Sequence, residues 1–188
     1  MYIYGLDLSM SNTGVTIIDS KTNEVVYIGS ISTTSKELEK LPIEYKHGKK
    51  LKHQFDEINK LIDEYPPEVA VVERGFTRFN NPTQVLFRVH GIFNLAFCET
   101  KTIYYTPKEI KNCIYQGNAS KEEIANVLSN RLNLKFKNED ESDSTAIAMT
   151  YLINEKGYEW KKVKALTEKD KLNAKRRKEK EELKKKKS

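Results

Sequence analysis

The first 32 residues contain three short segments with the composition of β-strands and very few residues between them. Residues 2–7 are an apolar run that ends in Asp7, and residues 13–20 and 24–32 are rich in Thr, Val, Ile and Tyr. Lys21-Thr22-Asn23, between the second and third segments, has the composition of a tight turn, which predicts a hairpin. Because short links join antiparallel neighbours, we expect the chain to begin with an antiparallel meander.

After the meander the hydrophobic period changes, and helical segments alternate with strand-like ones. Apolar residues recur at helical spacing from about residue 42 to residue 65, where Pro66-Pro67 ends the helix. Val69–Glu73 is a continuous apolar run, which is typical of a strand covered on both faces. The other expected elements are a helix over about 82–98, a strand over 102–105, two helices opened by the capping boxes Thr106–Glu109 and Ser120–Glu123, and a helix over about 140–156.

Hairpin strands followed by strands that alternate with helices predict an α/β fold. The sheet should be mixed and five-stranded, with three antiparallel strands and then parallel ones, and α-helices should flank it. This is the element order of the RNase H-like fold.

The charge of the chain is distributed unevenly. The formal net charge is +6, but residues 161–188 hold 14 Lys and Arg against 5 Asp and Glu, which leaves residues 1–160 at −3. We therefore expect one domain over 1–158 and a basic tail over 159–188, disordered or transiently helical, that either contacts a polyanion or only solubilises the chain.

The composition also excludes several classes of protein. No apolar run approaches the ~20 residues of a membrane-spanning helix, and the first residues lack the pattern of a secretory signal. The two cysteines, Cys98 and Cys113, rule out a disulfide scaffold and a cysteine-based zinc site. We therefore expect a cytoplasmic protein.

Four acidic residues stand out by their position in the predicted elements. Asp7 and Glu73 end apolar strands, and Asp140 and Asp143 lie three residues apart near the start of the last helix, on one helical face. If the first strand is central and the fourth strand pairs beside it, all four carboxylates meet. Carboxylates that close repel one another unless a cation lies among them, and oxygen ligands without His or Cys favour Mg²⁺ or Mn²⁺.

Each of these residues taken alone also has a purely structural explanation. Asp7 would cap a turn with Ser9, and Glu73 would pair with a nearby arginine. Asp140 and Asp143 would be acids of a first helical turn, where the helix dipole favours them.

Four segments of the chain resemble the RuvC-type Holliday junction resolvases of the RNase H-like nuclease superfamily, and most closely the phage branch of that family. Together they span about residues 1–155, and their order and spacing carry the likeness more than any one motif does. The segments are Tyr4–Ser9 with Asn12–Gly14, Val69–Phe76 with Arg88–Gly91, Tyr105–Lys111 with Gly117–Lys121, and Asp140–Ala148. Leu8-Ser9 departs from the Pro-Gly that family members often carry after the first Asp.

The resemblance implies roles for individual residues. It assigns two Mg²⁺ ions per active site, which Mn²⁺ can replace, to the carboxylates of Asp7, Glu73, Asp140 and Asp143. It further implies a homodimer with two active sites and products that end in a 5′-phosphate and a 3′-hydroxyl.

The aromatic residues of the helix expected over 82–98 exceed what one buried face requires, so they form either a dimer interface or additional core.

The segment after Glu73 has the composition of a DNA-contacting loop. Arginine suits phosphates through its bidentate fork, and an exposed aromatic ring can stack on an unpaired base. The family position for that ring falls on Phe76, whose alternative is to pack under its own loop. The expected DNA contacts are Arg74, Phe76, Arg78, Lys108, Lys111 and Lys121, where each lysine could also be an ordinary solvated residue.

These features predict a metal-dependent endonuclease that resolves Holliday junctions by paired symmetric cuts, during DNA recombination or repair or the processing of replicated phage DNA. Alternatives are a nuclease of broader branched-DNA specificity, a nuclease for RNA–DNA hybrids and a non-catalytic binder of branched DNA. An ATPase of the actin and sugar-kinase type shares the first-strand Asp, but such proteins are longer and carry Gly-rich adenosine motifs.

Overall fold

The structure, a computed structural model, describes residues 1–75 and 80–161. The strands are β1 (Tyr2–Asp7), β2 (Asn12–Asp19), β3 (Val25–Ser32), β4 (Pro67–Glu73) and β5 (Lys101–Tyr105). The helices are α1 (Lys36–Glu39), α2 (Ile43–Glu64), α3 (Asn80–Ala96), α4 (Pro107–Ile114), α5 (Lys121–Leu132) and α6 (Glu139–Glu155). Within these ranges, no helix is both long enough and apolar enough to cross a membrane.

The strands form one mixed sheet in the order β3-β2-β1-β4-β5. β1 pairs antiparallel with β2 and parallel with β4, and β5 continues the parallel half of the sheet. The predicted meander, the central position of the first strand and its pairing with the fourth strand are therefore confirmed. This order brings residues that lie more than sixty positions apart to neighbouring places in the sheet.

The predicted helices are present, with ends that differ by about two residues from those expected. The short helix α1 was not predicted, because four residues are too few to show a helical period. Ser35 caps it by accepting a hydrogen bond from the amide of Leu38. Both predicted capping boxes are formed, at the starts of α4 and α5.

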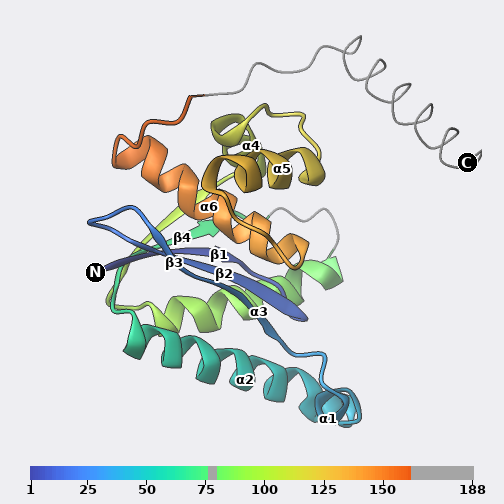
Figure 1. Ribbon diagram of the computed structural model, residues 1–188. Coiled ribbons are helices and arrows are strands. Elements are labelled where there is room, and N and C mark those ends of the chain that lie inside the picture. The colour runs from blue at the N-terminus through green and yellow to red at the C-terminus, as the bar shows by residue number, and fades with distance from the viewer. Residues whose placement is uncertain (76–79, 162–188) are drawn as a thin grey trace, which may run out of the picture.

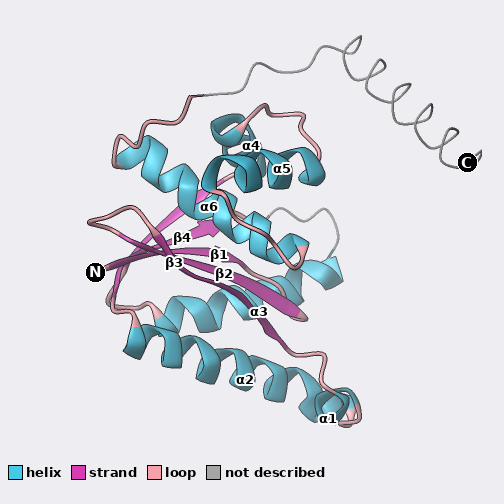
Figure 2. Cartoon of the chain, viewed as in Figure 1, coloured by secondary structure: helices cyan, strands magenta, loops and turns pink. Residues whose placement is uncertain are grey.

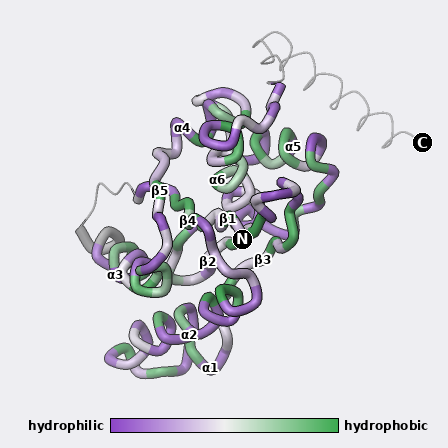
Figure 3. The backbone as a smooth tube through the Cα atoms, turned by 90° about the vertical axis from the view of Figure 1, so that its left-hand side faces the viewer, coloured by the Kyte–Doolittle hydropathy of each residue, from purple (hydrophilic) through white to green (hydrophobic). Residues whose placement is uncertain are grey.

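Helices cover both faces of the sheet (Figures 1 and 2). α2 and α3 lie against one face, and α4, α5 and α6 lie on the other. Successive side chains of a strand point to opposite faces, so β4 sends Val69 and Val71 into the core beneath α6 and Ala70 and Val72 into the core beside α2 and α3. The continuous apolar run of β4 thus supplies two separate cores. Figure 3 colours the chain by hydropathy, and hydrophobic and hydrophilic stretches alternate along α2, as expected for a helix with one buried face.

α6 packs very closely onto the strands because two glycines leave room for it. A Cβ atom added at Gly5 of β1 would lie 2.3 Å from the carbonyl oxygen of Ser144, and one added at Gly14 of β2 would lie 2.1 Å from that of Asp140. The hydroxyl of Thr16 hydrogen-bonds those of Ser144 and Thr145, each at 2.9 Å. The first turns of α6 are therefore fixed beside the ends of β1 and β2.

The chain after α6 remains in contact with the body through Trp160. Its indole N–H donates to the carbonyl of Ile114 at 2.9 Å, and the guanidinium of Arg131 lies 4.9 Å from the ring centroid. Trp160 is the second residue of the predicted basic tail, most of which lies outside the described residues.

Candidate active site

Strand alternation directs Asp7 and Glu73 toward the same face of the sheet. Ile3, Gly5 and Asp7 of β1 share the face that α6 covers, as do Val69, Val71 and Glu73 of β4. The parallel register pairs Leu6 with Val72, so the two acids lie one position beyond this last pair of neighbours. Two carboxylates that are 66 residues apart in the sequence thus meet where β1 and β4 end.

α6 and the helices before it complete a pocket of about 200 Å³ around these two acids. Asp143, in the second turn of α6, faces the pocket, and so do Lys111 of α4 and Lys121 of α5. The remaining lining is apolar and is provided by Pro107, Ile110, Ile124 and Ala146. Three of the four predicted acidic residues and two of the predicted lysines therefore line one pocket.

The electrostatics of this pocket disfavour the charged forms of its acids. Burial raises the pKa of Asp7 to about 7, with further contributions from the nearby carboxylates of Asp143 and Glu73. The pKa of Glu73 is also raised, first by burial and then by Asp143. The positive charges of the protein only partly offset burial and the repulsion among these carboxylates, and a bound cation would relieve what remains.

Lys121 supplies part of that compensation. Its ammonium group lies 2.6 Å from Asp143 Oδ2 and 3.5 Å from Glu139 Oε2. The hydrogen bond to Asp143 raises the pKa of Lys121 above its usual value, so the lysine stays charged. The ammonium therefore lies where it lowers the negative potential of the pocket, and it lowers the pKa of Asp7 and Glu73 in opposition to burial.

Asp140, the fourth predicted acid, does not line the pocket. Its Oδ2 accepts a hydrogen bond from the side-chain amide of Asn12, at the start of β2. Asp140 and Asp143 lie near one another on α6 as expected, but they have different partners, Asn12 and Lys121. The structure thus brings together three of the four acids and holds the fourth beside the loop between β1 and β2.

This division explains why no ready-made metal centre is present. In residues 1–75 and 80–161, no group of three or more His, Cys, Asp or Glu side chains is arranged to hold an ion. The donor chemistry nevertheless fits a hard divalent cation, because Asp7, Glu73 and Asp143 offer carboxylate oxygens to one pocket without a His or Cys ligand. Release of Asp143 from Lys121 would add its oxygens to those of the other two.

The other residues predicted to contact DNA differ in whether they line the pocket. Lys111 donates to the carbonyl of Ala119 at 2.8 Å while it lines the pocket. Lys108 and Arg74 are exposed and lie outside the pocket lining. Phe76 and Arg78 lie outside the described residues.

Sequence reasoning assigned no role to Asn12 or to Gln54 of α2. Asn12 binds Asp140, and Gln54 binds the loop that follows Asp7. Asn12 lies in one of the segments that carry the family resemblance, and that membership is the sequence feature that could have identified it. Gln54 gave none, since a glutamine at an apolar position of a helix has no recognisable motif.

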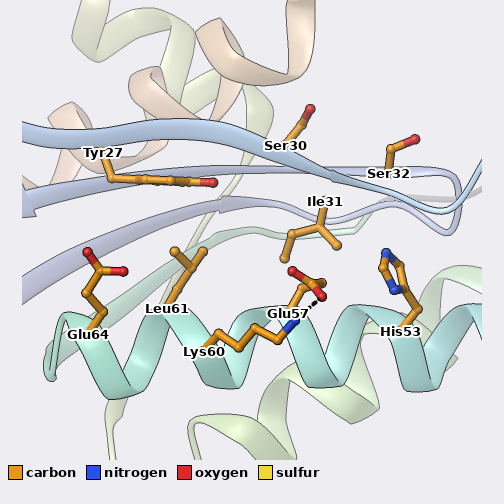
Figure 4. A pocket seen from close by; sticks show the side chains of 9 residues that line it. All are labelled: Tyr27, Ser30, Ile31, Ser32, His53, Glu57, Lys60, Leu61 and Glu64. Atoms are coloured by element: carbon orange, nitrogen blue, oxygen red, sulfur yellow. Dashed lines mark hydrogen bonds and ion pairs between the residues drawn. The ribbon is translucent and has the colours of Figure 1, made fainter.

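A second hollow, of about 300 Å³, lies between β3 and α2 (Figure 4). Its lining includes Tyr27, Ser30 and His53, together with the ion pair between Lys60 and Glu57 at 2.6 Å. It contains none of the predicted site residues. Lys60 neutralises Glu57, which leaves a net charge of about −1 from Glu64, so the hollow offers no concentrated charge for a ligand.

Comparison with known proteins agrees with this fold. The model of the family described as crossover junction endodeoxyribonuclease RuvC matches residues 3–151. The chain belongs to the RuvC family. The matched range contains every predicted acidic residue and runs from β1 into α6, so the family relationship covers the whole sheet and the helices that form the pocket.

Curated RuvC proteins match over nearly their full length. The crossover junction endodeoxyribonuclease RuvC of Prochlorococcus marinus subsp. pastoris is 31% identical over 165 residues, which cover 84% of this chain and 99% of that protein. The protein of the same name from Dictyoglomus thermophilum is 26% identical over the same lengths. The phage branch of the RuvC family stays a prediction.

Solved RuvC structures confirm the predicted fold. The Thermus thermophilus RuvC structure has a TM-score of 0.67 at 20% identity and covers 84% of this chain and 96% of that chain. T. thermophilus RuvC in complex with Holliday junction substrate gives 0.68 with the same identity and coverage. At this level of identity the likeness establishes the RNase H-like architecture and leaves individual residue roles to the chemistry of the site.

Proposed function

We propose that this RuvC-family chain is a Mg²⁺-dependent endonuclease that resolves four-way DNA junctions by paired nicks. One observation carries the proposal: acids from three separate segments, Asp7, Glu73 and Asp143, face one pocket together with two lysines. Carboxylates that are partly buried side by side cost stability, so their convergence is better explained by a bound cation than by folding. The RuvC relatives, named as crossover junction endodeoxyribonucleases, support the choice of substrate.

Asp7, Glu73 and Asp143 would hold the metal, with Asp140 joining them from the same helix face. Two Mg²⁺ ions, replaceable by Mn²⁺, would activate water and neutralise charge on the scissile phosphate. The carboxylates provide oxygen ligands only, which suits these ions better than zinc. Their burial keeps bulk water from screening the site.

The lysines of the pocket would bind the DNA. Lys111 and Lys121 lie on the α4–α5 side of the pocket and carry the positive charge that a phosphate needs beside three carboxylates. Lys121 would exchange Asp143 for a phosphate oxygen when DNA and metal enter. Arg74 and Lys108, both exposed, would contact the DNA backbone beside the cleavage site. In the loop after Glu73, Phe76 would stack on an unpaired base and Arg78 would bind a phosphate. The basic tail over 159–188 would add further phosphate contacts, and we infer that the protein works in the cytoplasm.

Cleavage of a synthetic four-way junction tests the proposal directly. With Mg²⁺ we expect paired nicks at symmetric positions that leave 5′-phosphate and 3′-hydroxyl ends, and with EDTA we expect binding without nicking. Duplex, flap, fork and RNA–DNA hybrid substrates serve as competitors. Equal cleavage of all of them would replace the resolvase by a general nuclease, and binding without cleavage in any divalent metal would leave a branched-DNA binder.

We further propose that the protein acts as a homodimer through α3. Phe87 and Leu95 are 59% and 62% exposed and lie on the same helix. Gly91 lies between them at helical spacing, and a Cβ atom there would meet nothing within 4 Å. This strip of two apolar residues around a glycine supports close contact with a second copy.

Charge placed on the strip should separate the protomers. The double substitution Phe87→Glu and Leu95→Glu buries like charges in the interface, so we expect a monomer in sedimentation velocity at a concentration where the wild-type protein is a dimer. Ile43→Glu with Tyr45→Glu is the matched control, because these α2 side chains are 67% and 64% exposed and lie on another helix. A dimer that survives the α3 substitutions, or dissociates equally with the control, would rule out this interface.

A further inference from the structure

α2 carries no acidic residue of the candidate site, yet one of its side chains reaches the loop that follows Asp7. Gln54 is 0% exposed and occupies the same face of α2 as the buried residues Lys50 and Ile58. A buried amide costs several kcal/mol unless its hydrogen bonds are made, whereas a leucine at such a position would pack without that cost. The glutamine therefore needs an explanation beyond filling the core.

The side-chain hydrogen bonds of Gln54 go to the connection between β1 and β2 and to Thr13, the second residue of β2. Its Nε2 donates to the carbonyl of Ser9 at 2.8 Å and to that of Met10 at 3.1 Å. The hydroxyl of Thr13 lies 3.4 Å from its Oε1. These carbonyls belong to a turn whose backbone has left the sheet, so side chains replace the missing ladder partners. Among the residues that the structure describes, Gln54 is the one side chain that binds both carbonyls; the hydroxyl of Thr13 also donates to Ser9, and that of Thr33 to Met10.

The same connection fixes two of the four acids. It starts directly after Asp7, and the amide of Ser9 donates to Thr13 Oγ1 at 3.2 Å, which closes the turn on itself. Asn12, the first residue of β2, donates its backbone amide to the hydroxyl of Ser9 in the connection at 3.0 Å and its side-chain amide to Asp140. Movement of the turn would therefore change the position of Asp7 and that of the group that holds Asp140.

We propose that Gln54 is a positioning residue that sets the geometry of the metal-binding carboxylates Asp7 and Asp140 by holding the β1–β2 turn. This inference rests on the proposed function, and it adds a role for α2, which makes no contact with the pocket. Groups that orient metal ligands affect metal affinity by about 10–100-fold when they are removed. Gln54 does not contact a carboxylate directly; it acts through the backbone carbonyls of Ser9 and Met10.

The sharpest test is Gln54→Met, which keeps the length of the side chain and removes both donors. We expect Mn²⁺ affinity, measured by calorimetry on the full chain without DNA, to fall by about 10-fold. In single-turnover junction cleavage we expect the rate constant at saturating enzyme to fall by a similar factor, while the enzyme concentration for half-maximal rate changes less than twofold.

Ile58→Ala is the control for a merely structural role. Ile58 is fully buried on the same face of α2 one turn later, so its truncation destabilises the fold without touching the turn. We expect a lower melting temperature and unchanged Mn²⁺ affinity for this variant. Thr33→Val is a second, milder probe, because the hydroxyl of Thr33 donates to the carbonyl of Met10 at 2.6 Å from the β3 side. Thr33→Val should also weaken Mn²⁺ binding, by less than Gln54→Met does. If Gln54→Met does not fold, Thr33→Val alone tests whether the β1–β2 turn positions the carboxylates.

The outcomes separate the two proposals. A wild-type chain that neither binds Mn²⁺ nor cleaves a junction overturns the proposed function and the role of Gln54 with it. A wild-type chain that does both, with unchanged Mn²⁺ affinity in folded Gln54→Met or, failing that, in Thr33→Val, overturns the positioning role alone. Equal losses in Ile58→Ala and Gln54→Met would reduce Gln54 to a core residue.

Discussion

Asp7→Asn and Glu73→Gln should each abolish junction nicking and leave junction binding nearly unchanged. Each substitution keeps the shape of the side chain and replaces one carboxylate oxygen by an amide nitrogen, which cannot ligate a divalent cation. Removal of a single electrostatic contact in an active site typically costs about 10²–10³ in rate, and we expect at least the upper end here. The measurement is nicking of a labelled four-way junction under single-turnover conditions in Mg²⁺.

Binding is the necessary second readout for these variants. The loss of a negative charge beside Lys111 and Lys121 should leave the dissociation constant for the junction in EDTA within about threefold of wild type or slightly tighter, at a stated salt concentration. Asp56→Asn, which changes an exposed acid on α2 that is paired with Lys52, should retain full activity. Unimpaired nicking by Asp7→Asn or Glu73→Gln would remove the metal mechanism, and lost binding would assign these acids to DNA recognition or folding instead.

Most of the sheet could be predicted because local composition and tertiary position agree along these strands. Val69–Glu73 is apolar at every position before its acid, and such a run is stable only with helices on both faces, where β4 indeed lies. The early hairpins fixed β1 next to β2. The parallel pairing of β1 with β4 required the fold-level argument, since no local signal joins residues so far apart.

The convergence of acids was predictable from the ends of strands, but their individual partners were not. Strand alternation and the start of α6 bring Asp7, Glu73 and Asp143 to one pocket, and both rules can be applied to a sequence. The contact between Lys121 and Asp143 depends on how α5 docks against α6, and that between Asn12 and Asp140 depends on the close approach at Gly14. Docking geometry of this kind has no periodic signature, so the split of the four acids could not be predicted from their spacing.

Asp7→Asn should also make the metal-free protein more stable, and increasingly so as the pH rises. Burial and the nearby carboxylates raise the pKa of Asp7 from 3.8 to about 7 in the folded chain. Between these two values the folded state binds more protons than the unfolded state, so the free energy of unfolding falls as the pH rises. The stability contributed by the protonated acid is complete below about pH 4 and is lost by about pH 8, whereas an asparagine does not titrate.

The expected size of the effect is set by the shift in pKa. One unit corresponds to about 1.4 kcal/mol, so between pH 5 and pH 8 the wild-type protein should lose about 2–3 kcal/mol relative to Asp7→Asn. This corresponds to a difference in melting temperature of about 4–12 °C for a chain of this size. Glu73 also has a raised pKa, mainly because of burial. Because the carboxylates of Asp7 and Glu73 repel each other, removal of the Asp7 charge also favours ionised Glu73, and the measured difference in stability includes this coupling.

Urea unfolding in EDTA at several pH values measures this difference, with Asp56→Asn as the variant that should follow the wild type. Mg²⁺ supplies the complementary measurement at pH 8, because a ligand that binds only the folded state stabilises it. Mg²⁺ should raise the melting temperature of the wild type and have little effect on Asp7→Asn. Parallel stability curves for the wild type and Asp7→Asn in EDTA would show that Asp7 is not under electrostatic strain, and equal stabilisation by Mg²⁺ would show that it does not hold the ion. If Asp7 lowers the free energy of unfolding without metal and raises it with Mg²⁺, then cation binding explains why a carboxylate is buried at this position.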